Sequence, residues 1–270
     1  MTAFWCEHAV LPGGVKRSVR LLTELGRIVD VRPEKVAEPD DVVLRGVVLP
    51  GLANAHSHAF HRALRGRTHD DGGNFWTWRD AMYRAALTLS PEDVYAVSRF
   101  CFIEMLRAGI TTVGEFHYLQ NDPSGYPYAN RNELAEQVIA AAVDVGLRIC
   151  LLNTCYATGG IAQPLLPEQR RFATTDIDVY LDATESLADA HVGDALVTVG
   201  VAPHSLRAVP REWVRMLHAW AGTHDAGGVG ALTVRRHRAG HRRGGFGKRA
   251  ARGLGTGAGG GELVRGDRGC

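Results

Sequence analysis

Apolar and polar residues follow two different patterns along this chain of 270 residues. In roughly the first 45 residues, short runs of alternating apolar and polar side chains are separated by glycine turns and followed by a polar stretch rich in proline, glutamate and aspartate. A period of two is typical of strands with one buried face. We expect strands at residues 4–10, 19–24 and 27–31. Residues 1–45 are therefore predicted to form a small β-sandwich-type layer ahead of the main domain.

Residues 46–226 change to a repeating order of strand and helix. The expected strands are apolar on both faces and lie at residues 47–49, 111–116, 148–154 and 196–202. The expected helices are amphipathic and lie at residues 91–107, 132–145, 176–190 and 210–221. Buried strands that alternate with amphipathic helices predict a parallel α/β sheet, and the count gives about four βα units.

The position of the polar residues favours a closed barrel over a doubly wound sheet. Each expected strand ends in a polar or aromatic cluster, and these clusters lie at residues 54–58, 115–118, 153–156 and 203–207. A (β/α)8 barrel keeps its active site at the carboxyl ends of its strands. The chain has no GxGxxG or GxxxxGK[ST] motif, so a nucleotide-binding fold has no support. We predict the first half of a (β/α)8 barrel at residues 46–226.

The composition changes abruptly after Ala226. Residues 227–270 hold 15 of the 32 glycines, 10 of the 31 basic residues and only 2 of the 29 acidic ones. The overall charge of +2 thus divides into about −6 for the body and +8 for the tail. We expect this tail to be disordered or to be translated out of frame, with a genuine low-complexity tail as the alternative. Either way, it cannot supply four further βα units.

Composition also bears on the cellular setting. The first ten residues have no charged-then-apolar leader, and no stretch approaches eighteen consecutive apolar residues. The five cysteines lack disulfide-like spacing or a CxxC pair. We expect free thiols, a cytoplasmic location and no membrane association.

The first cluster contains a histidine pair that suits a metal. His56 and His58 are two residues apart on an extended segment, so their side chains point to the same side. Neutral imidazoles suit zinc and similar divalent ions, and a catalytic zinc usually takes three protein ligands. The alternative for so short a motif is a pair of hydrogen-bonded loop histidines. The position after an apolar strand and a Pro-Gly turn favours the metal.

Several motifs together make a resemblance specific. The stretch LPGL at residues 49–52, followed by His56-Ser57-His58, resembles the first barrel strand of the amidohydrolase superfamily. Within it, four stretches resemble the formimidoylglutamate deiminases of histidine degradation: HSHAFHRALRG from residue 56, FWTWR from residue 75, GEFHYL from residue 114 and APHSLRAV from residue 202. The resemblance extends over about residues 1–225.

The resemblance implies different roles for several residues of this chain. His56 and His58 would be metal ligands, with Zn²⁺ or a similar divalent ion as the cofactor. Arg79, Tyr118, His204 and Arg207 would hold the glutamate portion of a dianionic small-molecule substrate. The family commonly has glutamine where this chain has His61, which is a further candidate without a firm role. Without the motif match, surface ion pairs and packed polar groups explain the same residues.

The implied reaction is metal-dependent hydrolysis of N-formimino-L-glutamate to N-formyl-L-glutamate and ammonia. The family takes its remaining metal ligands and its acid–base groups from later strands, so no catalytic residue is identified in this chain, and we expect impaired activity. The resemblance also implies a homodimer. Another superfamily deaminase, acting on guanine, cytosine or a triazine, is the nearest alternative. A nucleic-acid-binding protein acting through the basic tail is less favoured, because that tail has one aromatic residue, Phe246.

Overall fold

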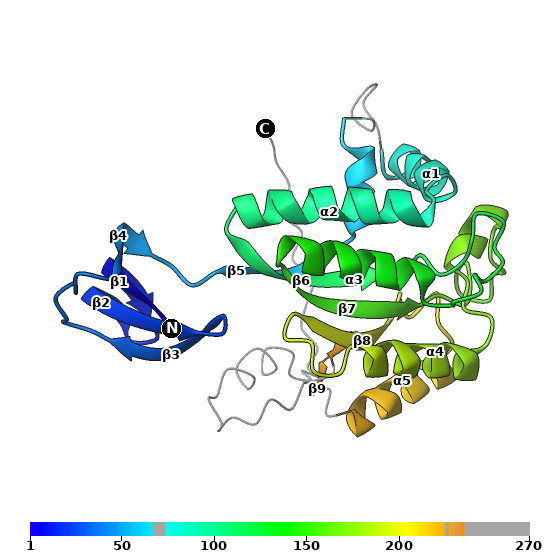
Figure 1. The fold of residues 1–270 in the computed structure, drawn as a ribbon. Helices are drawn as coiled ribbons and strands as arrows, with labels where there is room; N and C mark the ends of the chain where they lie inside the picture. The colour runs from blue at the N-terminus through cyan, green and yellow to red at the C-terminus, as the bar shows by residue number, and fades with distance from the viewer. Residues whose placement is uncertain (67–73, 225–226, 230–231, 235–270) are drawn as a thin grey trace, which may run out of the picture.

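The computed structural model describes residues 1–66, 74–224, 227–229 and 232–234, with backbone only for the last two segments. Two β-sheets account for all its strands: a four-stranded sheet near the N-terminus and a six-stranded sheet flanked by helices. The smaller sheet lies to one side of the helical unit, and an extended connection leads from it into the larger sheet (Figure 1). No helix among the described residues has the length and apolar character needed to cross a bilayer.

The small sheet has the strand order β3-β2-β1-β4. Its strands are β1 (Thr2–Leu11), β2 (Gly14–Glu24), β3 (Arg27–Arg32) and β4 (Val42–Val48). The first three are antiparallel neighbours, whereas β4 pairs with β1 in parallel. Cys6, Ala9 and Val19 form its buried centre. Asp41 ties the connection before β4 to β2, because the Arg20 side chain donates to both of its carboxylate oxygens at 2.9 Å.

One predicted strand belongs to a different sheet from the one expected. Residues 47–49 were expected to be the first buried strand of the barrel, but residues 47 and 48 lie in β4 of the small sheet and Leu49 follows that strand. Val47 and Leu49 are exposed. The first strand of the large sheet is instead β5 (Leu52–Ser57). The small layer thus extends to residue 48, because β1 offers β4 a free edge before the chain reaches the Pro-Gly turn.

The large sheet contains the four parallel strands that a half barrel requires. β5, β6 (Ile110–His117), β7 (Arg148–Cys155) and β8 (Val197–Pro203) are neighbours in chain order, each parallel to the next. Helices α2 (Pro91–Arg107), α3 (Glu133–Val145) and α4 (Ile177–Ala190) connect successive strands, and α5 (Arg211–Thr223) follows β8. The fold is therefore a partial (β/α)8 barrel of four βα units, as predicted.

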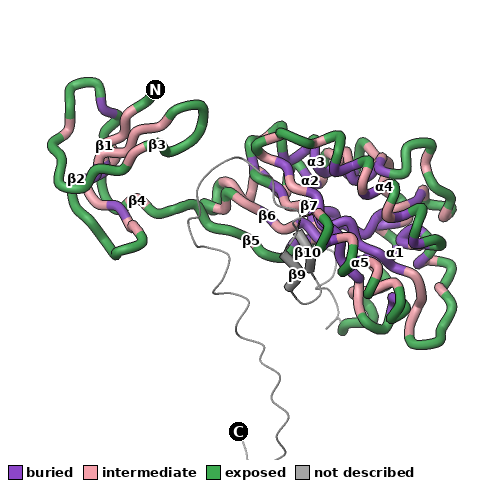
Figure 2. Tube along the Cα trace, turned by 90° about the horizontal axis from the view of Figure 1, so that it is seen from below, coloured by how far each residue is buried: buried purple, intermediate pink, exposed green. Residues whose placement is uncertain are grey.

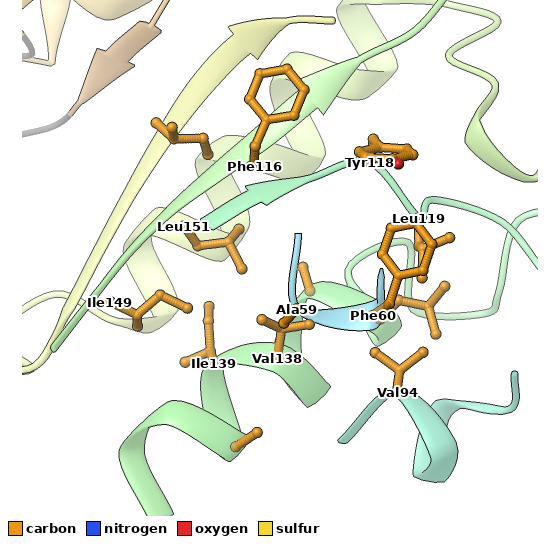
Figure 3. Close-up of a cluster of buried hydrophobic side chains, with 14 of the residues drawn as sticks. Ala59, Phe60, Val94, Phe116, Tyr118, Leu119, Val138, Ile139, Ile149 and Leu151 are labelled. Carbon is orange, nitrogen blue, oxygen red and sulfur yellow. The ribbon is translucent and has the colours of Figure 1, made fainter. Parts of the chain in front are cut away.

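The main core lies between the parallel strands and their helices (Figure 2). In Figure 3, Val138 and Ile139 of α3 lie beside Ile149 and Leu151 of β7, and Val94 of α2 lies near Phe60. The apolar stripe of α3 thus covers Ile149 and Leu151, which the alternation of side chains along β7 places on the same face. The layers of helix and sheet thus follow from the alternation of strands and amphipathic helices along the sequence.

Several elements were not expected from the sequence. The helix α1 (Phe75–Ala86) and the two 3₁₀ helices η1 (Ala59–Leu64) and η2 (Pro167–Phe172) all lie on the loops that surround the strand ends. The expected tail also contains two strands, β9 (Gly227–Val229) and β10 (Leu232–Val234), and β10 pairs antiparallel with β8. Antiparallel pairing does not continue a parallel barrel. The remainder of the tail, predicted to be disordered or out of frame, lies outside the described residues.

We predict that Gly114→Ala lowers the free energy of unfolding by about 1–3 kcal/mol, because a Cβ there would lie 3.0 Å from the carbonyl oxygen of Ala55 and push β5 away from β6. Urea unfolding followed by circular dichroism measures the change. The matched control is Gly222→Ala in α5, where a Cβ meets no atom within 4 Å. That variant should be neutral or more stable by about 0.5–1 kcal/mol. Equal behaviour of the two variants would contradict the close-contact argument.

Candidate active site

The end of β5 brings the two predicted metal histidines together. The pairing of β5 with β6 is irregular between Asn54 and Ser57, and His56 lies in this irregular segment. The Nε2 atoms of His56 and His58 are 3.0 Å apart. The Nδ1 of His58 is 3.0 Å from the carbonyl oxygen of Phe116, and because a carbonyl only accepts, this nitrogen carries the proton. The Nε2 of His58 therefore carries a lone pair, and this lone pair faces the Nε2 of His56.

This arrangement fits two of the ligands of a divalent metal ion. Zinc–imidazole bonds are about 2.0–2.1 Å long, so two nitrogens 3.0 Å apart can contact one ion. Burial lowers the pKa of His58. The hydrogen bond to Phe116 opposes this shift, and the nearby His56 adds to it. The lowered pKa favours the neutral ring, which is the form that binds a metal. Within the described part of the chain, no three histidine, cysteine or carboxylate side chains are grouped to hold an ion.

All seven residues singled out in the sequence line one cavity of about 730 Å³. His56, His58 and His61 come from the end of β5 and from η1, and Arg79 comes from α1. Tyr118 follows β6, whereas His204 and Arg207 follow β8. The carboxyl ends of three strands and one loop helix thus meet at the same opening, as a barrel requires of its active site.

Arg79 is held in a defined position by aromatic rings. Its guanidinium carbon lies 4.5 Å from the ring centre of Trp76 and 5.6 Å from that of Tyr83. Stacking of this kind restricts the rotamers of a long side chain and stabilises its charge. Its Nε is buried and has no protein partner. An unpaired donor of this kind at a cavity favours a ligand that brings an acceptor.

His204 presents a second unpaired polar atom to the same cavity. Its ring centre lies 4.3 Å from that of Tyr156, and its Nδ1 is buried without a protein partner. Burial lowers the pKa of His204 to about 4, with smaller contributions from Arg207 and His58. The ring is therefore neutral at physiological pH and offers one N–H donor and one acceptor nitrogen.

Tyr118 and His61 form a polar pair inside an aromatic setting. Tyr118 is buried, and its hydroxyl oxygen lies 2.6 Å from the Nε2 of His61. Burial raises the pKa of the Tyr118 hydroxyl, which stays protonated. Burial, with smaller contributions from the neighbouring His58 and His56, lowers the pKa of His61 to about 3. Both groups are consequently neutral.

Sequence reasoning missed a second polar network in the wall of the cavity. The side-chain nitrogen of Gln169 donates to the hydroxyl oxygens of Tyr83 and Tyr156, each at 3.0 Å. The side-chain oxygen of Gln169 accepts from the backbone of Leu166. This network joins α1, the end of β7 and η2. Tyr156 could have been found from its place at a strand end, whereas nothing in the sequence marked Gln169.

Glu115 lies behind the histidine segment and supports it. Its Oε1 accepts the backbone N–H of Ala59 at 2.7 Å, and its Oε2 is buried without a partner. Burial raises the pKa of this carboxyl to about 7, against the opposing hydrogen bonds from Ala59 and Ser57. Glu115 therefore holds the backbone directly after His58 from the neighbouring strand.

Comparison with known proteins assigns the class. The Amidohydrolase family model matches residues 47–228. This chain therefore belongs to the amidohydrolase family. The match covers the four βα units and the residues that line the cavity.

Individual relatives agree with this class. Formimidoylglutamate deiminase of Pseudomonas aeruginosa is 39% identical over 225 residues, which are 81% of this chain and 49% of that protein. The crystal structure of an amidohydrolase from Brucella melitensis has a TM-score of 0.79 and 37% identity over 82% of this chain and 50% of its own. Atrazine chlorohydrolase from Arthrobacter aurescens TC1, complexed with zinc, has a TM-score of 0.69 at 19% identity and shows the fold alone. Its alignment covers 84% of this chain and 51% of that one. The chain spans about half the length of the relatives it matches.

The raised pKa of Glu115 predicts a pH-dependent stability. Its pKa is about 7 in the folded chain and near the ordinary 4.5 in the unfolded chain, so only the unfolded carboxyl ionises as the pH rises between these values. The wild type should therefore lose stability relative to Glu115→Gln between about pH 4.5 and pH 8, by roughly 3 kcal/mol in total. Urea unfolding of both proteins at several pH values measures this difference.

The matched control is Glu24→Gln, which changes an exposed carboxyl at the end of β2. It should show no comparable trend with pH. A constant difference in stability between wild type and Glu115→Gln over this range would show that Glu115 ionises normally in the folded chain.

Proposed function

We propose that this chain provides the substrate-binding half of a metal-dependent hydrolase that converts N-formimino-L-glutamate to N-formyl-L-glutamate and ammonia. The observation that carries the proposal is the cavity in which two guanidinium groups lie with the histidine pair of β5. The similarity to formimidoylglutamate deiminase supports the substrate assignment. This chain spans 49% of that relative, so the complete reaction is part of the proposal.

The metal would be held by His56 and His58, with zinc or a similar divalent ion as the species that suits imidazole nitrogens. When bound, such an ion lowers the pKa of water to about 7 and provides the hydrolytic nucleophile. The chain's own part is to hold the His58 ring by the Phe116 carbonyl and to keep it neutral by burial. Glu115 fixes the backbone of the same segment through Ala59.

The substrate would be recognised by its two carboxylates. Arg79 and Arg207 carry only donors and a permanent positive charge, and Tyr118 and His204 add neutral polar groups beside them. Arg79 is already ordered by its stacking on Trp76, so binding costs little side-chain entropy there. The formimino carbon would then lie toward the histidine pair. We assign no general acid or base among the described residues.

A deaminase acting on a planar heterocycle is the second candidate. Trp76, Trp78 and Phe116 line the cavity, and aromatic faces are suited to stacking with a purine or a triazine. The two guanidinium groups speak against it, because an uncharged heterocycle would leave them without a counter-charge. The two candidates therefore differ in the charge of the ligand that they require.

The histidine pair predicts a specific metal site. Zinc should bind the wild-type chain at one equivalent, and His56→Ala or His58→Ala should each weaken its affinity at least about tenfold, because each removes a nitrogen from the pair. Competition with a chromophoric chelator measures the dissociation constants. The control is His218→Ala, which removes an exposed histidine of α5. Zinc binding that is insensitive to His56 and His58 would show that the ion binds elsewhere.

The paired arginines predict binding of a dianion. N-formyl-L-glutamate should bind the zinc-loaded chain, whereas guanine should not, and Arg79→Met or Arg207→Met should each weaken the affinity by about tenfold or more. Isothermal titration calorimetry measures both ligands. Arg84→Met is the matched control, since it removes an exposed guanidinium from the same helix as Arg79. Binding of guanine in preference to the dianion would favour the heterocycle deaminase.

A further inference from the structure

The hydrogen bond between His61 and Tyr118 has two chemically different forms. The Nε2 of His61 and the hydroxyl oxygen of Tyr118 are 2.6 Å apart, so one of these groups donates to the other. If Tyr118 donates, its only hydrogen is used and its oxygen offers lone pairs to the cavity. If His61 donates, the Tyr118 hydrogen remains available. The direction of this bond therefore decides what Tyr118 can bind.

The surroundings hold both rings in place. The backbone N–H of His61 donates to the carbonyl oxygen of His58 at 2.9 Å, which fixes the start of η1. The His61 ring lies edge to face with Phe60, with ring centres 4.4 Å apart, and also contacts Trp78. Tyr118 packs edge to face against Phe60 and Phe172. Neither ring can turn away from the other without losing these contacts, so the bond is a fixed feature of the cavity wall.

The charge of the cavity selects between the two forms. Arg79 and Arg207 are donors only, so the ligand that they attract brings acceptor oxygens. A Tyr118 that donated to His61 would turn lone pairs toward those oxygens, which is a repulsive contact. A Tyr118 that accepts from His61 adds a donor to a lining that already contains donors.

We propose that His61 donates its Nε2–H to the Tyr118 oxygen and thereby reserves the Tyr118 hydroxyl hydrogen for an anionic oxygen of the ligand. His61 is then a positioning residue that acts through Tyr118. The inference rests on the proposed function for the identity of the ligand, a dicarboxylate, but the direction of the bond can be measured without a ligand. Donation by His61 requires a proton on its Nε2. In the Nδ1–H tautomer, Tyr118 would be the donor instead.

The tautomer is measured directly by long-range ¹H–¹⁵N correlation spectroscopy on the full chain labelled at histidine. The His61 signals are assigned by their loss in His61→Gln. We expect the pattern of an imidazole protonated at Nε2, and a shift of that nitrogen in Tyr118→Phe, which removes the hydroxyl. A pattern protonated only at Nδ1 overturns the inference, because Tyr118 would then be the donor.

Binding supplies the second readout, with N-formyl-L-glutamate as the probe. His61→Gln keeps a side-chain N–H donor and should bind within about threefold of wild type, whereas His61→Met keeps the bulk without a donor and should lose about tenfold. Equal losses in the two variants would overturn the inference, since they would indicate packing alone. The unfolding midpoint of each variant establishes that it is folded.

The two proposals fail in distinguishable ways. A wild-type chain that binds no dianion overturns the proposed function, and the ligand part of this inference with it, even where His61 is protonated at Nε2. A chain that binds the dianion while His61 is protonated only at Nδ1 overturns the role of His61 and leaves the proposed function standing. Nε2 protonation together with rescue by His61→Gln supports both.

Discussion

The close approach of β5 to β6 is the constraint on which the rest of the site depends. Gly114 has no side chain, so the Ala55 carbonyl can lie directly against β6. A Cβ at residue 114 would be only 3.0 Å from the Ala55 oxygen. Directly after this contact, β6 contacts the histidine segment through the Glu115 carboxyl and the Phe116 carbonyl. The two imidazoles consequently meet at their Nε2 atoms, which lie 3.0 Å apart. The relative orientation of this histidine pair thus depends on strand packing.

A second consequence follows from the position of the strand ends. Parallel strands end on one edge, so each βα loop adds its polar residues to the same opening. The loops then compensate for the cost of burying polar groups. In the wall of the cavity, Gln169 donates to two tyrosine hydroxyls, and Trp76 stacks on the Arg79 guanidinium. Among the residues that line the cavity, Arg79 and His204 each keep one buried polar atom without a protein partner.

Much of this fold could be predicted because the helices and strands carry their own signals. Residues 91–107 were expected to be helical, and α2 has these bounds, since the Ser90 N-cap and the Asp93 side chain form a capping box at its start. The first barrel strand was misplaced because the apolar residues before the Pro-Gly turn belong to β4, whereas β5 after the turn contains Asn54, His56 and Ser57. Only the pairing of β4 with β1 separates them, and pairing between distant segments leaves no local pattern in the sequence.

By itself, the sequence determined the class of fold, the repeated βα order and the residue types of the site, including the histidine pair and the two arginines. These features depend on local periodicity and on short motifs, which can be recognised without knowing which distant residues are in contact. Only the tertiary structure decided that seven residues from four segments line one cavity, that Glu115 supports the histidine segment, and that His61 is paired with Tyr118. The physical reason is that the register between strands and the packing of loops determine which distant residues touch. Both depend on many residues at once and leave no local pattern in the sequence.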